Sequence, residues 1–303
     1  MELNEKIIEE YRKKSKLTDD EYEAYFSSVI EKFTNGKSRN NNPVAIYVAG
    51  QTGAGKSKLV NLVINRFLNK DNVVICNFDI IKTMHPKYRN VCNIPEIVHD
   101  VLMPDAGRLI DDFTKYCREN RFNIINEGTM QCTSEVIELL ENFKKDGYYV
   151  ELDILSVPKF ESYGAILYRY AENMEKESFP RLVPKNVHEE SFSRLLITLD
   201  ELTKRGLYDN VNVFRRGNEN EKYVPIKIYS LKEKQFHSAT EAVNYGRQQF
   251  RQRSINAFPQ MYSKVESIFR TKAPDKLTLL KDWRYLYEEE KNILSLRDYE
   301  RGK

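Results

Sequence analysis

The chain has few cysteines, and they form no pattern that binds metal or builds a disulfide framework. Its 303 residues include only four, widely spaced, without a Cys-x-x-Cys pair or a cluster of histidines beside them. Neither a zinc site nor a set of disulfides is therefore indicated. We expect free thiols in a reducing compartment, and hence a cytoplasmic location. The four residues are Cys76, Cys92, Cys117 and Cys132.

The chain also lacks a strong charge of one sign and a long apolar run. Lys and Arg number 48 against 45 Asp and Glu, a net charge of +3, which is too small and too scattered to favour nucleic-acid binding. No apolar run reaches the roughly 18 residues of a membrane span, and the acidic first residues predict no secretory signal. With 41% hydrophobic residues, the composition predicts a globular protein that binds neither nucleic acid nor membrane.

What the chain does contain is an alternation of short apolar runs and longer helical segments. The run at 44–49 has no polar alternation, which is typical of a strand buried on both faces. Helical segments of a dozen or more residues between such strands imply crossover connections and a mostly parallel sheet. Further strands are expected at 73–76, 122–126, 149–157, 211–214 and 224–229, and helices at 56–68, 100–119, 135–145, 160–177 and 192–205.

A complete phosphate-binding motif follows the first expected strand. The segment Gly-Gln-Thr-Gly-Ala-Gly-Lys-Ser matches G-x-x-x-x-G-K-[ST], the P-loop. Its glycines let backbone N–H groups aim at phosphate oxygens, and the next helix presents its positive end to the same anion. A chance match is the alternative, but a strand before the loop and a helix after it are the context that the motif requires. We predict that ATP binds to Gly50, Gln51, Thr52, Gly53, Ala54, Gly55, Lys56 and Ser57, with the Ser57 hydroxyl on Mg²⁺.

One acidic residue follows the second expected strand. Asp79 belongs to the segment Asn77-Phe78-Asp79, at the edge of the sheet where open parallel sheets bind their ligands. No Asn-Lys-x-Asp motif of a GTPase is present in the sequence. A carboxylate beside a P-loop can accept the proton of a substrate hydroxyl or hold Mg²⁺. The alternative is that Asp79 caps the helix after it.

Helical segments flank this region on both sides. Residues 1–37 carry apolar residues at helical spacing, and 18–21 has the form of a capping box. From about residue 232 the chain becomes charged and aromatic, again with helical spacing. We therefore predict an N-terminal helical segment at 1–37, a three-layer α/β domain of the P-loop kinase type at 38–231, and a C-terminal helical extension at 232–303. Neither flanking segment carries chemistry that the sequence identifies.

Several ordered pieces of the sequence together resemble the zeta toxins, the P-loop kinases of epsilon–zeta toxin–antitoxin systems. Each piece is weak alone, but the set, in order and correctly spaced from the P-loop over about 44–230, is specific. The pieces are Asn77-Phe78-Asp79 with His85-Pro86 and Tyr88, then Asn126-Glu127-Gly128-Thr129, then Val157-Pro158-Lys159 with Ser162-Tyr163, Arg169-Tyr170 and Arg181.

The resemblance implies a kinase that transfers the γ-phosphate of ATP to the 3′-hydroxyl of the amino sugar in UDP-N-acetylglucosamine, which blocks cell-wall synthesis. It implies that Lys56 and Ser57 hold phosphate and Mg²⁺, and that Arg169 and Arg181 clamp the transferring phosphate. Arginine suits such a role because its planar guanidinium binds phosphate bidentately. The alternative for Arg169 is an ordinary solvated position on a helix. The resemblance also implies a small helical antitoxin as partner, which would pack near the N-terminal helices; these helices could equally cover the sheet's own apolar surface.

The acceptor side of the implied site departs from the family pattern. The resemblance makes Asp79 the general base and puts Asp79, Asp111, Glu127 and Thr129 in the acceptor pocket. Asp111 stands where the family has Glu, Gln131 where it often has Arg, and Leu139 where it has a polar residue. The ATP side is intact, so phosphoryl transfer is the firmer expectation. Two other functions stay open: a kinase of the same fold for another hydroxyl acceptor, such as a different UDP-amino sugar, NAD or a nucleoside, and a P-loop module that binds ATP without transfer.

Overall fold

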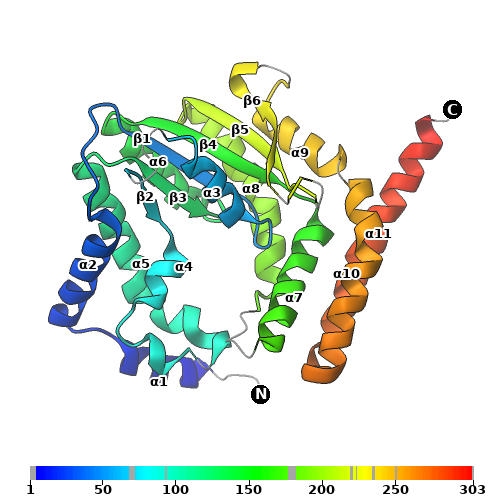
Figure 1. Cartoon of the computed structure of the whole chain (residues 1–303), viewed down its shortest axis with the longest axis horizontal. Coiled ribbons are helices and arrows are strands. Elements are labelled where there is room, and N and C mark those ends of the chain that lie inside the picture. The colour runs from blue at the N-terminus through cyan, green and yellow to red at the C-terminus, as the bar shows by residue number, and fades with distance from the viewer. Residues whose placement is uncertain are drawn as a thin grey trace.

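The computed structural model describes residues 5–67, 72–92, 94–176, 182–218, 221–222, 224–233, 236–249 and 251–301. A six-stranded sheet lies at its centre (Figure 1), in the order β2-β3-β1-β4-β5-β6. The first five strands are parallel, and β6 is antiparallel to β5. The strands are β1 Val44–Ala49, β2 Val74–Cys76, β3 Ile124–Gly128, β4 Tyr149–Ser156, β5 Asn210–Arg215 and β6 Ile226–Ser230. The mostly parallel α/β sheet predicted from the sequence is confirmed.

Helices cover both faces of the sheet. In β1, Tyr47 joins one apolar cluster with residues of α2, α5, α6, α8 and α9, while Val48 joins another with α3. The strand is therefore buried on both sides, as its uninterrupted apolar run predicts. The helices are α1 Glu5–Ser15, α2 Asp19–Thr34, α3 Lys56–Ile64, α4 Phe78–Thr83, α5 Pro95–Glu119, α6 Thr133–Lys145, α7 Lys159–Glu175, α8 Lys185–Arg205, α9 Ala239–Gln249, α10 Arg251–Lys272 and α11 Leu277–Arg301, with 3-10 turns at Tyr88–Asn90, Leu231–Glu233 and Pro274–Lys276.

The element boundaries differ most from the sequence prediction at four places, one of which is α3, predicted over 56–68 but ending at Ile64. The short helix α4 directly after β2 is not predicted, because six residues are too few to show a helical period. Helix α5 begins at Pro95 rather than at residue 100, and α8 begins at Lys185 rather than at 192, directly after Pro184. The capping box is confirmed, since Thr18 and Glu21 each accept the other's backbone N–H. All four cysteines are free thiols, as predicted.

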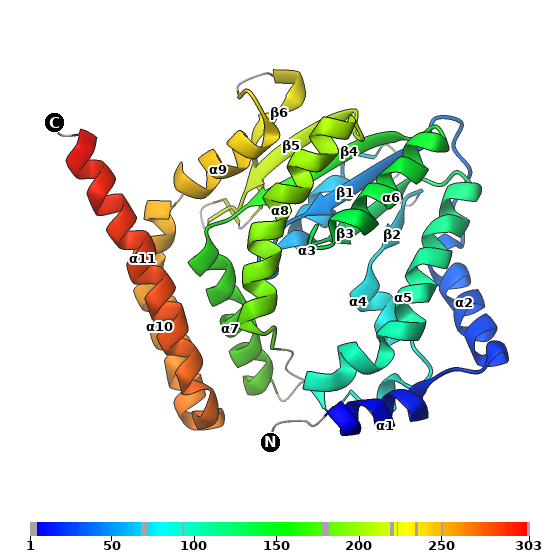
Figure 2. The ribbon, with the colours of Figure 1, turned by 180° about the vertical axis from the view of Figure 1, so that it is seen from behind.

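The two ends of the chain pack on opposite sides of the sheet domain. Helices α1 and α2 lie against α5, while α10 and α11 lie beside α7 (Figures 1 and 2). The single tryptophan, Trp283 of α11, is 1% exposed and its indole N–H donates to the Phe160 carbonyl at 2.9 Å. A Cβ on Gly164 of α7 would lie 2.2 Å from the Trp283 ring, so this contact requires glycine. Among the described residues no helix is both long and apolar enough to cross a membrane.

Candidate functional site

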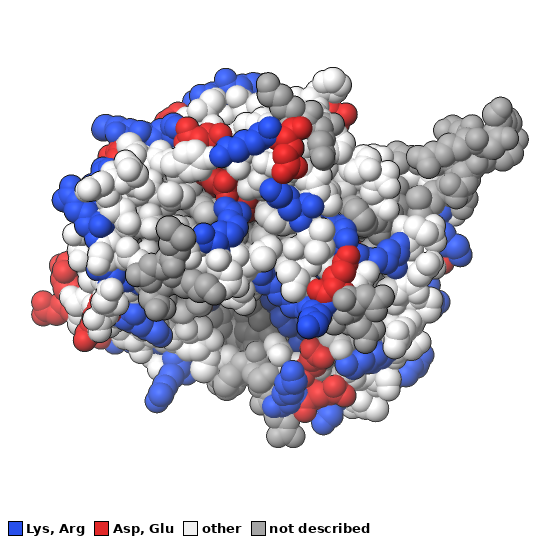
Figure 3. Space-filling model, turned by 45° about the horizontal axis from the view of Figure 1, so that its top comes forward, with Lys and Arg blue, Asp and Glu red and all other residues white. Residues whose placement is uncertain are grey.

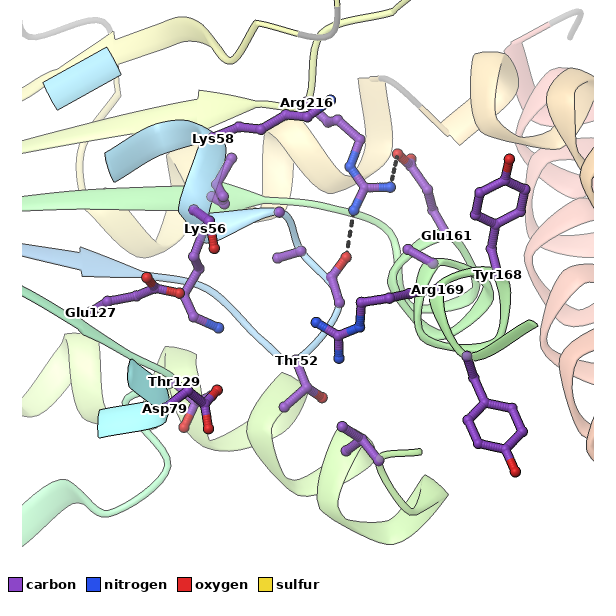
Figure 4. Close-up of a pocket in the computed structure, with 18 of the residues that line it drawn as sticks. Thr52, Lys56, Lys58, Asp79, Glu127, Thr129, Glu161, Tyr168, Arg169 and Arg216 are labelled. Atoms are coloured by element: carbon purple, nitrogen blue, oxygen red, sulfur yellow. Dashed lines mark hydrogen bonds and ion pairs between the residues drawn. The ribbon is translucent and has the colours of Figure 1, made fainter. Parts of the chain in front are cut away.

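A cavity of about 2500 Å³ opens where the parallel strands end (Figure 4). Five neighbouring strands deliver residues to it, because the carboxyl ends of parallel strands meet at one edge of the sheet. The P-loop follows β1, Asn77 to Asp79 follow β2, Gly128 ends β3 and Thr129 follows it, Leu155 is near the end of β4, and Arg216 follows β5. Helices α7 and α10 line the cavity further out.

The backbone of the P-loop is held in a conformation that only glycine permits. Gly53 has φ +77°, and a Cβ there would lie 2.0 Å from the carbonyl oxygen of Ser162. The backbone N–H of Ala54 donates to the Gln51 carbonyl at 3.1 Å, and the Lys56 ammonium donates to the Gly50 carbonyl at 3.0 Å. The loop is therefore preformed, with its lysine folded over it and α3 starting directly behind it.

Buried polar contacts fix the P-loop to α7 and α8. The Gln51 side-chain amide donates to the Val157 carbonyl at 2.7 Å and to the Ser162 hydroxyl at 3.2 Å. That hydroxyl contacts Nε2 of His188 at 2.8 Å. His188 is fully buried, and burial lowers its pKa to about 4, so its imidazole is neutral near pH 7. The Thr52 backbone N–H donates to the Ser191 hydroxyl at 3.2 Å.

Asp79 faces the cavity because a neighbouring residue caps the helix. Asn77 is the N-cap of α4, since its side-chain oxygen accepts the Ile80 backbone N–H at 3.1 Å. The Asp79 side chain is 59% exposed, lines the cavity and lies 3.0 Å from the Lys82 ammonium. The alternative interpretation of Asp79 as the cap is therefore wrong.

Glu127 and Thr129 lie on the same wall of the cavity. The Asn77 amide donates to a Glu127 carboxylate oxygen at 2.8 Å. Burial raises the pKa of Glu127, while the nearby Lys56 charge opposes that shift. Figure 4 shows Glu127 and Lys56 side by side, with Asp79 and Thr129 below them. The structure thus brings two carboxylates, a lysine and a hydroxyl to one region.

Of the remaining predicted residues, Arg169 lies at the cavity and Asp111 does not line it, while Arg181 is not described. Arg169 lines the cavity and points from α7 toward the P-loop (Figure 4). Arg181 lies outside the residues that the structure describes. Asp111 is exposed on α5 and is not among the lining residues; its pKa is raised by partial burial and by the charges of Glu135, Asp112 and Glu138. The structure does not bring Asp111 to the other predicted residues.

Among the lining residues that are not predicted from the sequence, two form a connected pair beside the P-loop. Arg216 donates to the carbonyl of Gly53 in the P-loop and forms an ion pair with Glu161 of α7 at 3.1 Å (Figure 4). A signal for Arg216 is present in the sequence, because it directly follows a strand that reaches the same edge of the sheet. Glu161 gives no comparable signal, since it is one of several acidic residues on an amphipathic helix.

The cavity carries an excess of positive charge. The lining residues include seven Lys and Arg against four Asp and Glu, which favours a polyanionic ligand. In Figure 3, Lys and Arg side chains border a hollow in the surface, interspersed with acidic ones. The basic residues are Lys56, Lys58, Arg169, Arg216, Arg253, Lys264 and Lys276, and the acidic ones are Asp79, Asp100, Glu127 and Glu161.

Comparison with known proteins identifies the family. A model of the family described as "Zeta toxin" matches residues 28–225, more than half of the chain. The chain belongs to the zeta toxin family. Toxin zeta of Streptococcus pyogenes is 25% identical over 216 residues, 70% of this zeta-family chain and 72% of the relative. Toxin PezT of Streptococcus pneumoniae serotype 4 is 24% identical over 205 residues, 66% of this chain and 79% of the relative.

Solved structures share the fold. A chain from a study of the PezAT chromosomal toxin-antitoxin system of Streptococcus pneumoniae matches with a TM-score of 0.71 at 19% identity, over 84% of this chain and 98% of that one. A chain of the AvrRxo1-ORF1:-ORF2 complex with ATP matches with a TM-score of 0.52 at 15% identity, over 89% and 84% of the two chains. This protein therefore belongs to a family of toxins of the P-loop kinase type and has the fold of that family, as the sequence resemblance predicts.

Proposed function

We propose that this zeta-family protein is an ATP-dependent phosphotransferase, and that its acceptor is the 3′-hydroxyl of the amino sugar in UDP-N-acetylglucosamine. One observation carries the proposal: a complete P-loop, the carboxylates of Asp79 and Glu127 and the guanidinium of Arg169 all line one cavity. Phosphoryl transfer depends on positioning and on stabilising charge, which is what such an arrangement supplies. ATP as the donor is further supported by a protein of similar fold whose structure was solved with ATP.

The proposed reaction is an in-line displacement at the γ-phosphorus. Asp79 accepts the proton of the acceptor hydroxyl as the hydroxyl oxygen bonds to phosphorus, and the bond from phosphorus to the β–γ bridging oxygen breaks to release ADP. Lys56 follows the β- and γ-phosphates, while Arg169 meets the charge that develops on the transferring group. Glu127 and Thr129 contact the acceptor. Arg181 stays a predicted second clamp, and the division of the chain at residues 38 and 231 stays a prediction too.

Mg²⁺ is the cation that this donor set fits. Ser57 offers a hydroxyl at the start of α3, and Mg²⁺ prefers oxygen ligands, several of which come from the phosphates. Within the described part of the chain no group of three or more His, Cys, Asp or Glu side chains could hold a metal ion alone. The ion would therefore bind together with ATP and neutralise phosphate charge.

A second acceptor class is favoured by one specific observation. Asp111, which the family resemblance puts in the acceptor pocket, lies outside the cavity, and Gln131 rather than an arginine lines it. Both differences fall on the acceptor side. The second candidate is therefore the same transfer to another hydroxyl compound, namely a different UDP-amino sugar, NAD or a nucleoside.

The test is an acceptor panel. The protein is incubated with ATP and Mg²⁺ together with UDP-sugars, NAD or nucleosides, and each acceptor is examined for a mass gain of one phosphate. We expect the gain on UDP-N-acetylglucosamine. A gain on another compound alone supports the second candidate, and no gain with any acceptor, despite ATP binding, contradicts transfer altogether.

The proposal includes the arginine clamp. Arg169→Lys keeps the charge but loses the planar fork, so kcat should fall strongly with little change in the KM for ATP. Arg270→Lys, an exposed substitution on α10, serves as the control. Equal kcat and KM values for Arg169→Lys and the wild type would show that Arg169 is an ordinary surface arginine.

The proposal also includes a protein partner and a location. The PezAT chain of similar fold comes from a toxin-antitoxin system, and by analogy we propose a small helical antitoxin for this chain. The exposed surface of α1 and α2, which pack on α5, is the proposed docking region. Four free thiols are consistent with the proposed cytoplasmic location. If a small gene for a helical protein adjoins the gene of this chain, co-expression of the two followed by co-purification tests the partner.

A further inference from the structure

The C-terminal extension forms a wall of the cavity. The match to the family model ends at residue 225, yet seven residues of α10, together with Lys276 and Trp283, line the cavity. Helices α10 and α11 reach it by packing on α7. The packing is close, since the Trp283 indole donates to the Phe160 carbonyl and its ring lies against Gly164. The extension is therefore adjacent to the proposed chemistry.

A chain of polar contacts runs from α10 to the P-loop. The Ser254 hydroxyl of α10 donates to one carboxylate oxygen of Glu161 on α7. The other oxygen of Glu161 pairs with Arg216 at 3.1 Å. Arg216 in turn donates to the carbonyl of Gly53. Four separate segments of the sequence thus meet in one continuous set of contacts.

The ion pair between Glu161 and Arg216, in the middle of this series of contacts, is shielded from water. The Glu161 side chain is 10% exposed and that of Arg216 is 20% exposed, so their attraction is weakly screened. A second contact from α10 supports Arg216 from behind, since the Arg253 guanidinium donates to the Arg216 backbone carbonyl at 2.8 Å. The same Arg253 lies 3.7 Å from Glu221. Arg216 is therefore held at both its backbone and its side chain.

The Gly53 carbonyl is a sensitive point of the loop. Gly53 has a positive φ, and its peptide group precedes Ala54, whose N–H already donates to the Gln51 carbonyl. A donor fixed on the Gly53 carbonyl keeps that peptide plane from rotating. The N–H groups of the following residues then stay aimed at the phosphates without any help from the ligand.

We propose that Glu161 and Arg216 are positioning residues for the P-loop, and that the C-terminal helices α10 and α11 hold them in place through Ser254 and Arg253. The inference rests on the proposed function, in that the ligand of the P-loop is taken to be ATP. It assigns the extension a part in phosphate binding.

The first experiment measures the affinities of the full-length protein for ATP, ADP and adenosine, each with Mg²⁺, in Glu161→Gln and Arg216→Lys. We expect ATP and ADP to bind about tenfold more weakly, the loss of one hydrogen bond to a charged group. Adenosine affinity should not change, because adenosine has no phosphate for the P-loop to hold. Glu172→Gln, on the same helix but outside the lining of the cavity, is the matched control, and thermal melting verifies the fold of each variant.

The second experiment tests the extension itself. Ser254→Ala and Arg253→Gln should each weaken ATP binding about threefold to tenfold. Ser254→Ala removes the hydrogen bond to Glu161, and Arg253→Gln removes the one to the Arg216 carbonyl. Ser267→Ala and Arg270→Gln, exposed positions on the same helix, should leave it unchanged. Titrating ATP with the single tryptophan as reporter gives the affinities directly.

Three results with the variants would overturn the inference. Unchanged ATP affinity in Glu161→Gln and Arg216→Lys would show that the contact chain does not position the loop. An equal loss of adenosine affinity would make these residues direct contacts of the nucleoside instead. Unchanged ATP affinity in both α10 variants would show that the C-terminal extension does not position the P-loop. A wild-type protein that binds no ATP would contradict the proposed function and this inference together, whereas a wild type that binds ATP while the variants match it contradicts the inference alone.

Discussion

Asp79 owes its position to the residue two places before it. Asn77 caps α4 with its oxygen and donates to Glu127 with its nitrogen, so one amide orders both the helix start and the neighbouring carboxylate. This arrangement leaves the Asp79 carboxylate at the cavity, beside the Lys82 ammonium. The Asn77 side chain thus orders the part of the cavity that carries Asp79, the proposed general base.

Replacing the proposed base should separate chemistry from binding. Asp79→Asn keeps size and polarity but cannot accept a proton, so kcat should fall by about 10²–10⁴, the usual contribution of a general base. ATP affinity should be largely retained. Steady-state kinetics with the acceptor found in the panel checks both values, and Asp275→Asn, an exposed position, is the control. If ATP affinity is lost instead, Asp79 anchors Mg²⁺.

His188 should make stability depend on pH. Its pKa is about 4 in the folded protein because of burial, against about 6.5 when the chain is unfolded. Between these values only the unfolded chain takes up the proton, so stability present above pH 6.5 is lost as the pH falls toward 4, by roughly 3 kcal/mol.

Melting temperatures measured across this pH range check the prediction. The melting temperature should change less steeply with pH in His188→Gln than in the wild type. In His237→Gln, which alters an exposed histidine, the pH dependence should equal that of the wild type. Parallel curves for His188→Gln and the wild type would contradict it. His85, which is also buried and has a lowered pKa, contributes equally to both proteins and cancels in the comparison.

At the scale of elements, the contact between α7 and α11 depends on the absence of one side chain. Gly164→Ala puts a methyl group 2.2 Å from the Trp283 ring, so α11 must move away or the ring must turn. We expect a loss of about 1–3 kcal/mol in stability, the usual cost of overpacking. The tryptophan emission should shift to longer wavelength as the indole meets water.

Gly107→Ala is the matched control, because it also lies in a helix. The nearest atom there is the flexible end of Met103, which can move, and alanine favours the helix by up to about 1 kcal/mol. Stability should therefore stay level or rise. An equal loss in the two variants would mean that the α7–α11 contact is no tighter than an ordinary helix interior.

The elements show where local sequence information ends. The strands and the P-loop are predicted because each carries a local signature, such as the apolar run of β1 or the glycines of 50–55. The start of α8 is not, since the polar segment 185–191 has no strong apolar period and its place is fixed by contacts of His188 and Ser191 with other elements. The hydrogen bond from Arg216 to Gly53 joins residues 163 positions apart, and no local pattern encodes such a contact. Asp111 is predicted from the family resemblance alone, and it is not among the residues that line the cavity.

At the scale of the whole molecule, ligand binding should stabilise the fold. ATP with Mg²⁺ at about 100 times its dissociation constant contributes about 2.7 kcal/mol, which should raise the melting temperature by about 5 °C for a chain of this size. Lys56→Ala removes the charge on the β- and γ-phosphates, so the shift should vanish while the melting temperature without ligand stays close to that of the wild type. Lys227→Ala, at an exposed ion pair on β6, should keep the shift. A full shift in Lys56→Ala would contradict the P-loop assignment.

The close seat of Trp283 against Gly164 has a consequence for how the molecule is made. The two residues are 283 − 164 = 119 positions apart, and translation proceeds at about 5–20 residues per second, so roughly 6–24 s separate their synthesis. During that interval α7 has been synthesised but the helices that cover it have not. Its apolar side is then exposed to water or contacts other apolar surface. The part of the cavity wall that α10 and α11 form is therefore made after the P-loop and α7, and the cavity has its complete wall only once translation of α11 is under way.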